Sequence, residues 1–368
     1  MTSTSTSTST APRFLPALDA WLKAPSCAVA LAVAGMLAVP ASAQAVPVNL
    51  GVAGNFNVFA LGNFNSMYSD TEGAVAVQGN ATLTGYSVNL HNQAGYAGQS
   101  LVVGGNLSFS SGSIDHGNAY VGGSASMSNL GFGGTLQRGG TAPFSFADAA
   151  QQLNTLSMDL ASVTASGTVN MNPWGGVSFV GDGSAGTQIF EIDGVDLLSR
   201  NSISLSNLSR GQTLIFNIYG ETAGFRNVGL DGFRDYNVLF NFVDATDLVL
   251  KGVGVYGSIL APNASVNGGW DGQINGNVVV KNWNSNIQIN NNHLFATAEV
   301  ALPQAAPSPA PAPAPAPGPD TSPTFEQIGS PPAQAVPEPG TLALLLPVLG
   351  LLAFSSRRRG MAGMAAPA

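Results

Sequence analysis

A short pattern of apolar alternation followed by a glycine-rich turn recurs along the chain and limits the folds open to it. Alternation with period two places one face of a strand in a core, and a Gly-Asn turn supplies the positive φ that a tight corner needs. Gly79, Gly105 and Gly123 are roughly 26 and 18 residues apart, a range in which repeats stack as solenoid coils. The pattern reads AVAVQGNATL from Ala74, LVVGGNLSF from Leu101, AYVGGSASM from Ala119 and QINGNVVV from Gln273.

We therefore predict a mainly β protein with a β-solenoid or β-helix body. A sandwich of β-hairpins is the alternative, because Gly-Asn is also a hairpin turn. The turns keep a similar strand context from one repeat to the next, which favours the solenoid. Further strand-like runs follow at 177–180, 188–192, 202–208, 213–219, 236–243 and 247–255.

One segment, 147–163, has the period of an amphipathic α-helix. Ser145 or Asp148 is its expected N-cap. A single helix beside a solenoid would cover one face or one end and protect strand edges from aggregation. Its apolar positions, at steps of three and four, are Ala150, Leu153, Leu156, Leu160 and Val163.

The N-terminus predicts a cleaved signal peptide, residues 1–43. An apolar run at 27–39 of about a dozen residues is shorter than the roughly 20 needed to span a bilayer. Ala41-Ser-Ala43 follows it as a small-x-small site for signal peptidase. Cleavage there removes the single cysteine, Cys27, which excludes thiol catalysis, disulfides and thiolate metal sites from the mature protein.

The charge composition limits the classes of partner that the protein is expected to bind. Only 9% of the 368 residues are charged, and 45 are glycine, which suits an extracellular β-rich protein with many tight turns. Removal of both terminal signals would leave 7 basic and 18 acidic residues, a net charge of −11. Such an acidic body argues against nucleic acid or anionic lipid as a partner.

The C-terminal region predicts a spacer followed by a short membrane stop. Alternating Ala-Pro at 305–319 favours extended polyproline II within a linker at 299–335. The apolar segment 341–354 would be about 21 Å long as a helix, short for a hydrocarbon core of about 30 Å. The positive-inside rule would keep the next residues cytoplasmic: Arg357, Arg358 and Arg359.

The sequence VPEPGTLALLLPVLGLLAFSSRRRG, at 336–360, resembles a PEP-CTERM sorting signal. Two prolines hold the triplet Pro337-Glu338-Pro339 extended and present Glu338 to a protease. The resemblance implies that exosortase, a membrane enzyme of Gram-negative bacteria, recognises the triplet and removes the tail that follows, with 361–368 at its end. A plain hydrophobic anchor is the alternative.

Two stretches of the body, 56–88 and 256–283, resemble the two ends of the choice-of-anchor A domain, an adhesin-like family of bacterial surface domains. The resemblance covers 47–298. It implies a surface or matrix location and an adhesive or structural role, but no ligand.

Candidate sites for chemistry are few. Asp70 and Glu72 have the spacing of a possible acid–base pair, although capping a turn is the commoner role of such residues. Three carboxylates suggest an oxygen-rich calcium site, without the spacing of known calcium loops. The histidines lack metal-ligand spacing, and the tryptophans would either stack on sugars or fill corners of the core. The calcium candidates are Asp182, Asp231 and Asp235, the histidines are His91, His116 and His293, and the tryptophans of the body, after the signal peptide, are Trp174, Trp270 and Trp283.

We predict a non-enzymatic, exported protein with an adhesive or structural role in the envelope or biofilm matrix, where extracellular polysaccharide is a possible partner. The first alternative is an ice-binding adhesion protein. It predicts a flat Thr/Ser ladder, but the outward threonines are not clearly periodic in sequence. The second is a carbohydrate-active β-helix enzyme, which needs acid and base residues clustered in a groove.

Overall fold

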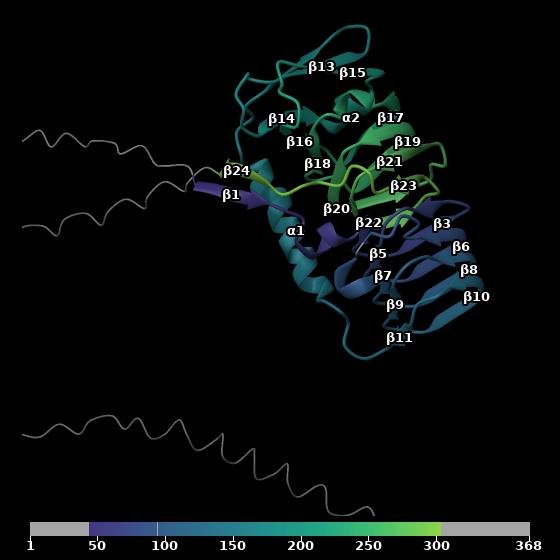
Figure 1. The fold of residues 1–368 in the computed structure, drawn as a ribbon. Coiled ribbons are helices and arrows are strands. Elements are labelled where there is room, and N and C mark those ends of the chain that lie inside the picture. The colour runs from purple at the N-terminus through teal and green to yellow at the C-terminus, as the bar shows by residue number, and fades with distance from the viewer. Residues whose placement is uncertain (1–43, 94, 303–368) are drawn as a thin grey trace, which may run out of the picture. The chain divides into compact units, whose positions relative to one another are not determined.

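The computed structural model describes residues 44–93 and 95–302, and the body is mainly β, with two α-helices and three 3₁₀ turns (Figure 1). Its strands form two runs of coils, a small three-stranded sheet and a terminal pair. The helical elements are η1 (Gly51–Asn55), η2 (Tyr96–Gly98), α1 (Phe146–Ala161), α2 (Gly194–Leu198) and η3 (Asp231–Phe233).

The first run winds from the middle of the body to one end. Its strands are β2 (Val58–Ala60), β3 (Phe64–Met67), β4 (Asp70–Thr71), β5 (Val75–Val77), β6 (Ala81–Val88), β7 (Gln99–Val103), β8 (Leu107–Ile114), β9 (Asn118–Val121), β10 (Ala125–Phe132) and β11 (Leu136–Arg138).

The second run starts at the opposite end and winds back to the middle. Its strands are β14 (Gln188–Asp193), β16 (Thr213–Tyr219), β17 (Thr222–Gly229), β18 (Asn237–Phe242), β19 (Asp247–Tyr256), β20 (Ser258–Asn267), β21 (Gly272–Asn275), β22 (Val278–Asn284) and β23 (Gln288–Asn290).

The remaining strands form two smaller sheets. One sheet joins β13 (Gly176–Val180) to β12 (Thr168–Met171) and β15 (Ser202–Ser206). The terminal pair is β1 (Gln44–Val48) antiparallel to β24 (Ala298–Leu302).

Successive coils pair in parallel and make three ladders, which we call faces. Face A runs β11-β9-β7-β5-β2-β22-β20-β18-β16-β14. Face B runs β10-β8-β6-β3-β22-β20-β19-β17. Face C continues from the far halves of the long strands and runs β10-β8-β6-β4-β23-β21-β19-β17. Pairing between successive repeats is thus parallel, unlike that of the predicted hairpin alternative.

The first coil of the chain lies beside the last. β2 and β3 pair with β22, and β4 pairs with β23, across about 219 residues of sequence. Figure 1 shows this contact in the middle of the body, where the purple and green strands meet. We call it the seam.

The predicted repeat is confirmed by the register. Ala81 pairs with Leu107, and Leu107 pairs with Ala125, which are steps of 26 and 18 residues. All six of the further strand-like runs form strands, and β16 has the predicted bounds. Inside the coils, Phe190, Phe216 and Phe240 lie in one column, with neighbouring ring centroids 5.1 and 5.2 Å apart.

The predicted reason for the repeated glycines, a positive φ, holds for Gly276 (φ 149°) and is wrong for the other three. Gly79, Gly105 and Gly123 do not have positive φ. They are required because neighbouring coils approach closely: a Cβ on Gly105 would lie 2.6 Å from the carbonyl oxygen of Gly79.

The asparagine of the repeat has its own role. Asn63 Oδ1 accepts a hydrogen bond from the Asn80 amide (2.9 Å), and Asn80 Oδ1 accepts one from the Asn106 amide (2.8 Å). Asn106 Oδ1 then accepts one from the Ser124 amide (2.9 Å). Each asparagine side chain therefore accepts a hydrogen bond from a backbone amide of the next coil. It does so at a corner where the strand ladder is interrupted and that amide would otherwise lack a partner.

Helix α1 covers face A, as the amphipathic pattern predicted. Ser145 is the N-cap, and its Oγ accepts from the Asp148 amide at 3.2 Å. One predicted core position is wrong, because Ala149 rather than Ala150 is buried, and α2 is a second helix that the pattern did not predict. The buried positions of α1 are Phe146, Ala149, Leu153, Ser157 and Leu160.

Two buried asparagines of face A hold α1 in place. Asn217 Nδ2 donates to the Leu160 carbonyl (2.7 Å), and Asn241 Nδ2 donates to the Ser157 carbonyl (2.9 Å). The apolar side chains around them pack against the same helix in one cluster. Face A is therefore closed by the segment that connects the two runs of coils.

Candidate functional site

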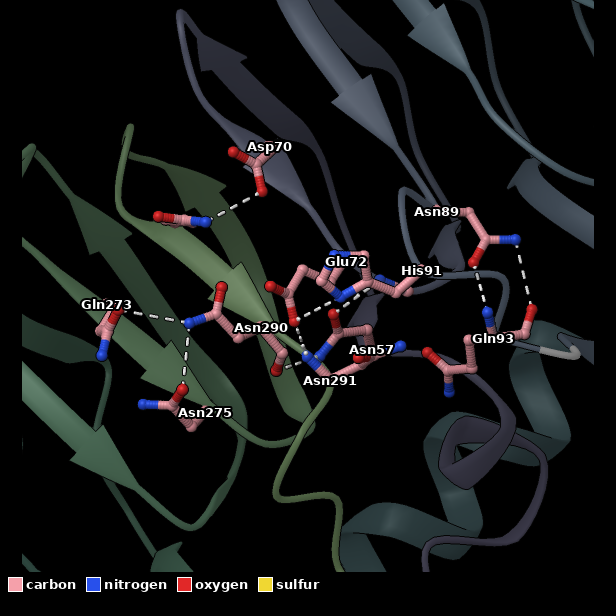
Figure 2. Close-up of polar contacts among 12 residues, drawn as sticks. Asn57, Asp70, Glu72, Asn89, His91, Gln93, Gln273, Asn275, Asn290 and Asn291 are labelled. Atoms are coloured by element: carbon pink, nitrogen blue, oxygen red, sulfur yellow. Dashed lines mark hydrogen bonds and ion pairs between the residues drawn. The ribbon is translucent and has the colours of Figure 1, made fainter. Parts of the chain in front are cut away.

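The predicted acid–base pair lies at the seam (Figure 2). Glu72 Oε2 accepts from the Asn291 amide at 3.0 Å and lies 3.3 Å from His91 Nδ1. Asp70 accepts from Gln288 Nε2 at 3.3 Å. Burial raises the pKa of Asp70 above its usual range, and the nearby charge of Glu72 raises it further. Both carboxylates therefore hold the first coil to the last.

Buried asparagines complete the seam, and the sequence analysis missed them. Asn57 Nδ2 donates to the carbonyls of Gly276 (2.7 Å) and Asn290 (3.1 Å), and its Oδ1 accepts from the Gly73 amide (3.0 Å). Asn290 Nδ2 in turn donates to Asn275 Oδ1 at 3.0 Å. A buried amide can pair backbone donors and acceptors at once, so it suits a place where strands from distant parts of the chain meet. The signal in the sequence was an asparagine next to a buried apolar run.

The three histidines do not come together. His91 is the partner of Glu72, and His116 is exposed in a turn with positive φ. His293 is half-buried, its ring lies edge-on to Tyr256, and its Nε2 has no partner among the described residues. Burial lowers the pKa of His293 below its usual value.

The predicted calcium site is not formed. Asp231 pairs with Arg234 (2.8 Å) and Asp235 with Arg210 (2.6 Å). Asp182 accepts from Gln188 Nε2 at 2.6 Å, so each carboxylate already has a separate partner. Within residues 44–93 and 95–302, no three His, Cys, Asp or Glu side chains are grouped to hold a metal ion.

Face B carries a regular column of exposed polar side chains. Each member is opposite the next in the strand register, so neighbours are about 4.8 Å apart. All are small or amide side chains, and they come from six successive coils. In order they are Asn267, Asn284, Asn65, Thr82, Ser108 and Ser126.

A second column lies beside the first, nearer the corner with face C. Here Thr84 Oγ1 and Ser110 Oγ share a hydrogen bond of 3.2 Å across neighbouring coils. Met67 and Ser128 extend the column on either side in the same register. The first column, which is polar throughout, makes face B the polar counterpart of face A, whereas the second includes the exposed apolar side chain of Met67.

The tryptophans divide between the two predicted roles. Trp283 is fully buried and stacks on Phe64, with ring centroids 6.2 Å apart. Trp174 is 83% exposed and Trp270 is 75% exposed. Only the latter two can contact a ligand.

The sorting and cleavage residues lie outside the described residues. Within the described part of the chain, no helix combines the length and apolar character needed to cross a membrane. The predicted membrane stop at 341–354 also lies outside. The predicted residues concerned are Ala41, Ala43, Pro337, Glu338, Pro339, Arg357, Arg358 and Arg359.

Parallel strand ladders with one covered apolar face and one exposed polar face define a domain of the mainly β class. Residues 49–291 match the family model of ice-binding-like adhesive domains, pAdhesive_15, over more than half of the chain, and the chain belongs to that family. The match names this family and not the choice-of-anchor A domain, although both are adhesive. Searches of the curated proteins and of the solved structures each returned no match.

Residues 335–359 match the PEP-CTERM protein-sorting motif, as predicted from the Pro-Glu-Pro triplet and the arginines. An adhesive domain joined to this motif fits an exported, surface-associated protein that exosortase processes.

Proposed function

We propose that this chain is a non-enzymatic adhesive and structural protein of the envelope or extracellular polysaccharide matrix of a Gram-negative bacterium, with a role in biofilm. The body is a β-solenoid, and face B is its adhesive surface. The observation that carries the proposal is the exposed column from Asn267 to Ser126, because no packing need explains six aligned exposed polar side chains. The carboxylates at the seam are engaged in structure, so an enzymatic role gains no support from them.

The domain order supports export followed by sorting. Signal peptidase cuts after Ala43, the domain at 47–298 folds outside, and the linker at 299–335 separates it from the sorting signal at 336–360. Exosortase recognises Pro337, Glu338 and Pro339 while the apolar segment is transiently in the membrane and Arg357 to Arg359 remain on the cytoplasmic side. The short tail at 361–368 leaves with the signal.

The intact mass of the mature protein from its host tests the sorting step. We expect a form that starts near Gln44 and ends near Val336, and its loss in Glu338→Ala. An unprocessed C-terminus in both proteins would leave only a membrane anchor and contradict the sorting step.

Attachment of cells tests the adhesive role. A strain lacking 47–298 but keeping both signals should lose attachment and matrix integrity. A strain with Trp174→Ala, a change in the small sheet outside face B, is the control and should attach as the parent does. Equal attachment of the deletion strain and the parent would reject the adhesive role.

Ice binding is the second candidate, and the same column favours it. The outward side chains of face B are periodic in space although their sequence spacing is irregular. Thermal hysteresis and inhibition of ice recrystallisation should then be lost in Thr82→Tyr/Ser108→Tyr, because bulky rings break a flat face. A parent protein with no effect on ice growth removes this candidate.

A further inference from the structure

The corner between faces B and C is built in the same way in successive coils. Tyr68, Gly85, Ser111 and Asn129 occupy equivalent positions, and all four have positive φ between 51° and 58°. The backbone of this corner therefore repeats from coil to coil, and only the side chains that it presents differ. At the coil beside the seam that side chain is Tyr68, which is large and exposed.

Two exposed aromatic rings lie along this corner. Trp270 follows β20 and is 75% exposed, and Tyr68 follows β3 and is 79% exposed. The coil between them connects the two positions, because the Asn286 backbone amide donates to the carbonyl of Gly269, the residue before Trp270, at 2.9 Å. On the coil between them, Asn286 presents its amide, whose Oδ1 accepts from the Met67 backbone at 2.9 Å.

Two cations continue the same line. Arg226 of β17 and Lys251 of β19 are directly opposite in the register, and both are exposed. Like charges opposite one another on neighbouring strands destabilise a sheet. Within residues 44–93 and 95–302, neither has a carboxylate at ion-pair distance, whereas Arg200, Arg210 and Arg234 each have one.

These groups come from five neighbouring coils, on or just after β17, β19, β20, β22 and β3, and we call them the cationic–aromatic edge. Its order is Arg226, Lys251, Trp270, Asn286 and Tyr68. The pair of cations is a local exception in an acidic body, which would carry 18 acidic and 7 basic residues after removal of both signals. An adjacent pair of cations without acidic partners is complementary to an anionic ligand.

We propose that the cationic–aromatic edge binds an acidic polysaccharide, with the glycan chain lying along the stack of coils. Carboxylates of uronic acid residues pair with Arg226 and Lys251, and sugar rings stack on Trp270 and Tyr68. The line of rings favours an extended chain over a globular protein, whose contact would gather the aromatic side chains into a central patch. The amide of Asn286 lies where a sugar hydroxyl would pass. This inference rests on the proposed adhesive function and names its ligand class.

Binding of the secreted mature protein to polygalacturonate, measured by affinity electrophoresis and calorimetry, tests the proposal. Arg226→Gln/Lys251→Gln should weaken binding about tenfold, because two exposed charge pairs are together worth about 1.4 kcal/mol. Trp270→Ala should also weaken it about tenfold. Added salt should weaken binding by the parent and have little effect on the double variant.

Matched control variants are available in the same chain. Lys281→Gln removes an exposed cation away from the edge, and Trp174→Ala removes an exposed tryptophan of the small sheet. Both should bind as the parent does, and dextran should not bind to any variant. Thermal melting checks that all variants fold, as expected for substitutions at exposed positions.

Three results would overturn the proposal: unchanged binding in the edge variants, an equal loss in Lys281→Gln, or equal binding of dextran. Attachment of host strains distinguishes failure of this proposal from failure of the proposed adhesive function. A host strain with the edge variant that attaches like its parent, while the strain lacking 47–298 does not, would reject the edge and keep the adhesive role.

Discussion

Faces A and B are made by the same coils, yet they differ in what they present. In four successive coils face A points Phe59, Ala76, Val102 and Tyr120 outward, and all four are buried beneath α1 and the segments around it. The same coils point Asn65, Thr82, Ser108 and Ser126 outward on face B, where all four are exposed. The same backbone repeat therefore buries apolar side chains on face A and exposes polar side chains on face B.

The comparison teaches that the covering segment, and not the coil, decides which face is available for binding. Residues of face A contribute to stability because apolar surface is removed from water. The side chains of face B remain exposed to water after folding, so they contribute little to stability. Their regular spacing is therefore not set by packing and is available to match a ligand. Substitutions should therefore separate the two faces by their effect on stability.

The largest effect is expected for Phe59→Ala on face A. The Phe59 ring lies 5.5 Å from that of Phe146 and 5.8 Å from that of Phe144, measured between centroids. Its loss should lower the free energy of unfolding by about 3–5 kcal/mol in denaturant titrations. Thr82→Ala on face B is the control, with an expected change within about 0.5 kcal/mol. Similar losses in both variants would break the distinction between the faces.

The next effect is expected for Asn57→Ala at the seam. The substitution leaves two carbonyls and one amide of the buried backbone without their partner, which should cost about 3 kcal/mol in the same titration. Asn80→Ala, at an exposed corner with one such bond, should cost about 1 kcal/mol. If both cost the same, the seam is no more dependent on its amides than any other corner.

A smaller effect is expected for Ser145→Ala at the start of α1. Loss of the cap should lower the free energy of unfolding by about 1 kcal/mol. Ser145→Asp keeps an acceptor at that position and should restore most of the loss. A cap variant as stable as the parent would show that packing on face A alone fixes the first turn of the helix.

The smallest effect concerns pH and His293. Its pKa is lowered in the folded state, so the unfolded chain binds the proton more readily. The contribution is present above about pH 6.5, the value for an unfolded histidine, and is lost as the pH falls from there through the folded pKa. Urea titrations over this interval should show a shallower loss for His293→Gln. An identical pH dependence would assign the effect to other groups.

Local pattern predicted the elements well. The alternation at 213–219 gives β16 without error, and the helical period at 147–163 differs from α1 by one or two residues at each end. The repeated glycines predicted the coil spacing although the reason given for them was wrong for three of the four. Glycine is required both where φ is positive and where two backbones approach closely, and a single sequence does not distinguish these two causes.

The seam and the column on face B could not be predicted in the same way. Pairing of β2 with β22 joins residues at opposite ends of the domain, and no local pattern records it. The steps from Asn65 to Thr82, Ser108 and Ser126 are 17, 26 and 18 residues, because loops of different length separate the strands. Periodicity in space is thus hidden by unequal spacing in sequence.

The tryptophans show the same limit. Trp270 follows two glycines and Trp283 lies between two asparagines, and only the register reveals that Trp283 points inward onto Phe64. Of the cationic–aromatic edge, the sequence analysis named only Trp270 as a residue that could stack on sugars, because its proximity to Arg226 and Lys251 depends on the order of the coils.

The pairing of β1 with β24 has a mechanical consequence. Figure 1 shows both strands on the α1 side of the body, away from the strands β3, β6, β8 and β10 that form face B. The segment before β24 is hydrogen-bonded to the second run. Asn277 Oδ1 accepts from the Phe295 amide and Asn237 Oδ1 accepts from the Ala296 amide, both at 2.9 Å. A pull on β24 would therefore be passed to the coils of the second run through Asn277 and Asn237, on β22 and β18 or next to them.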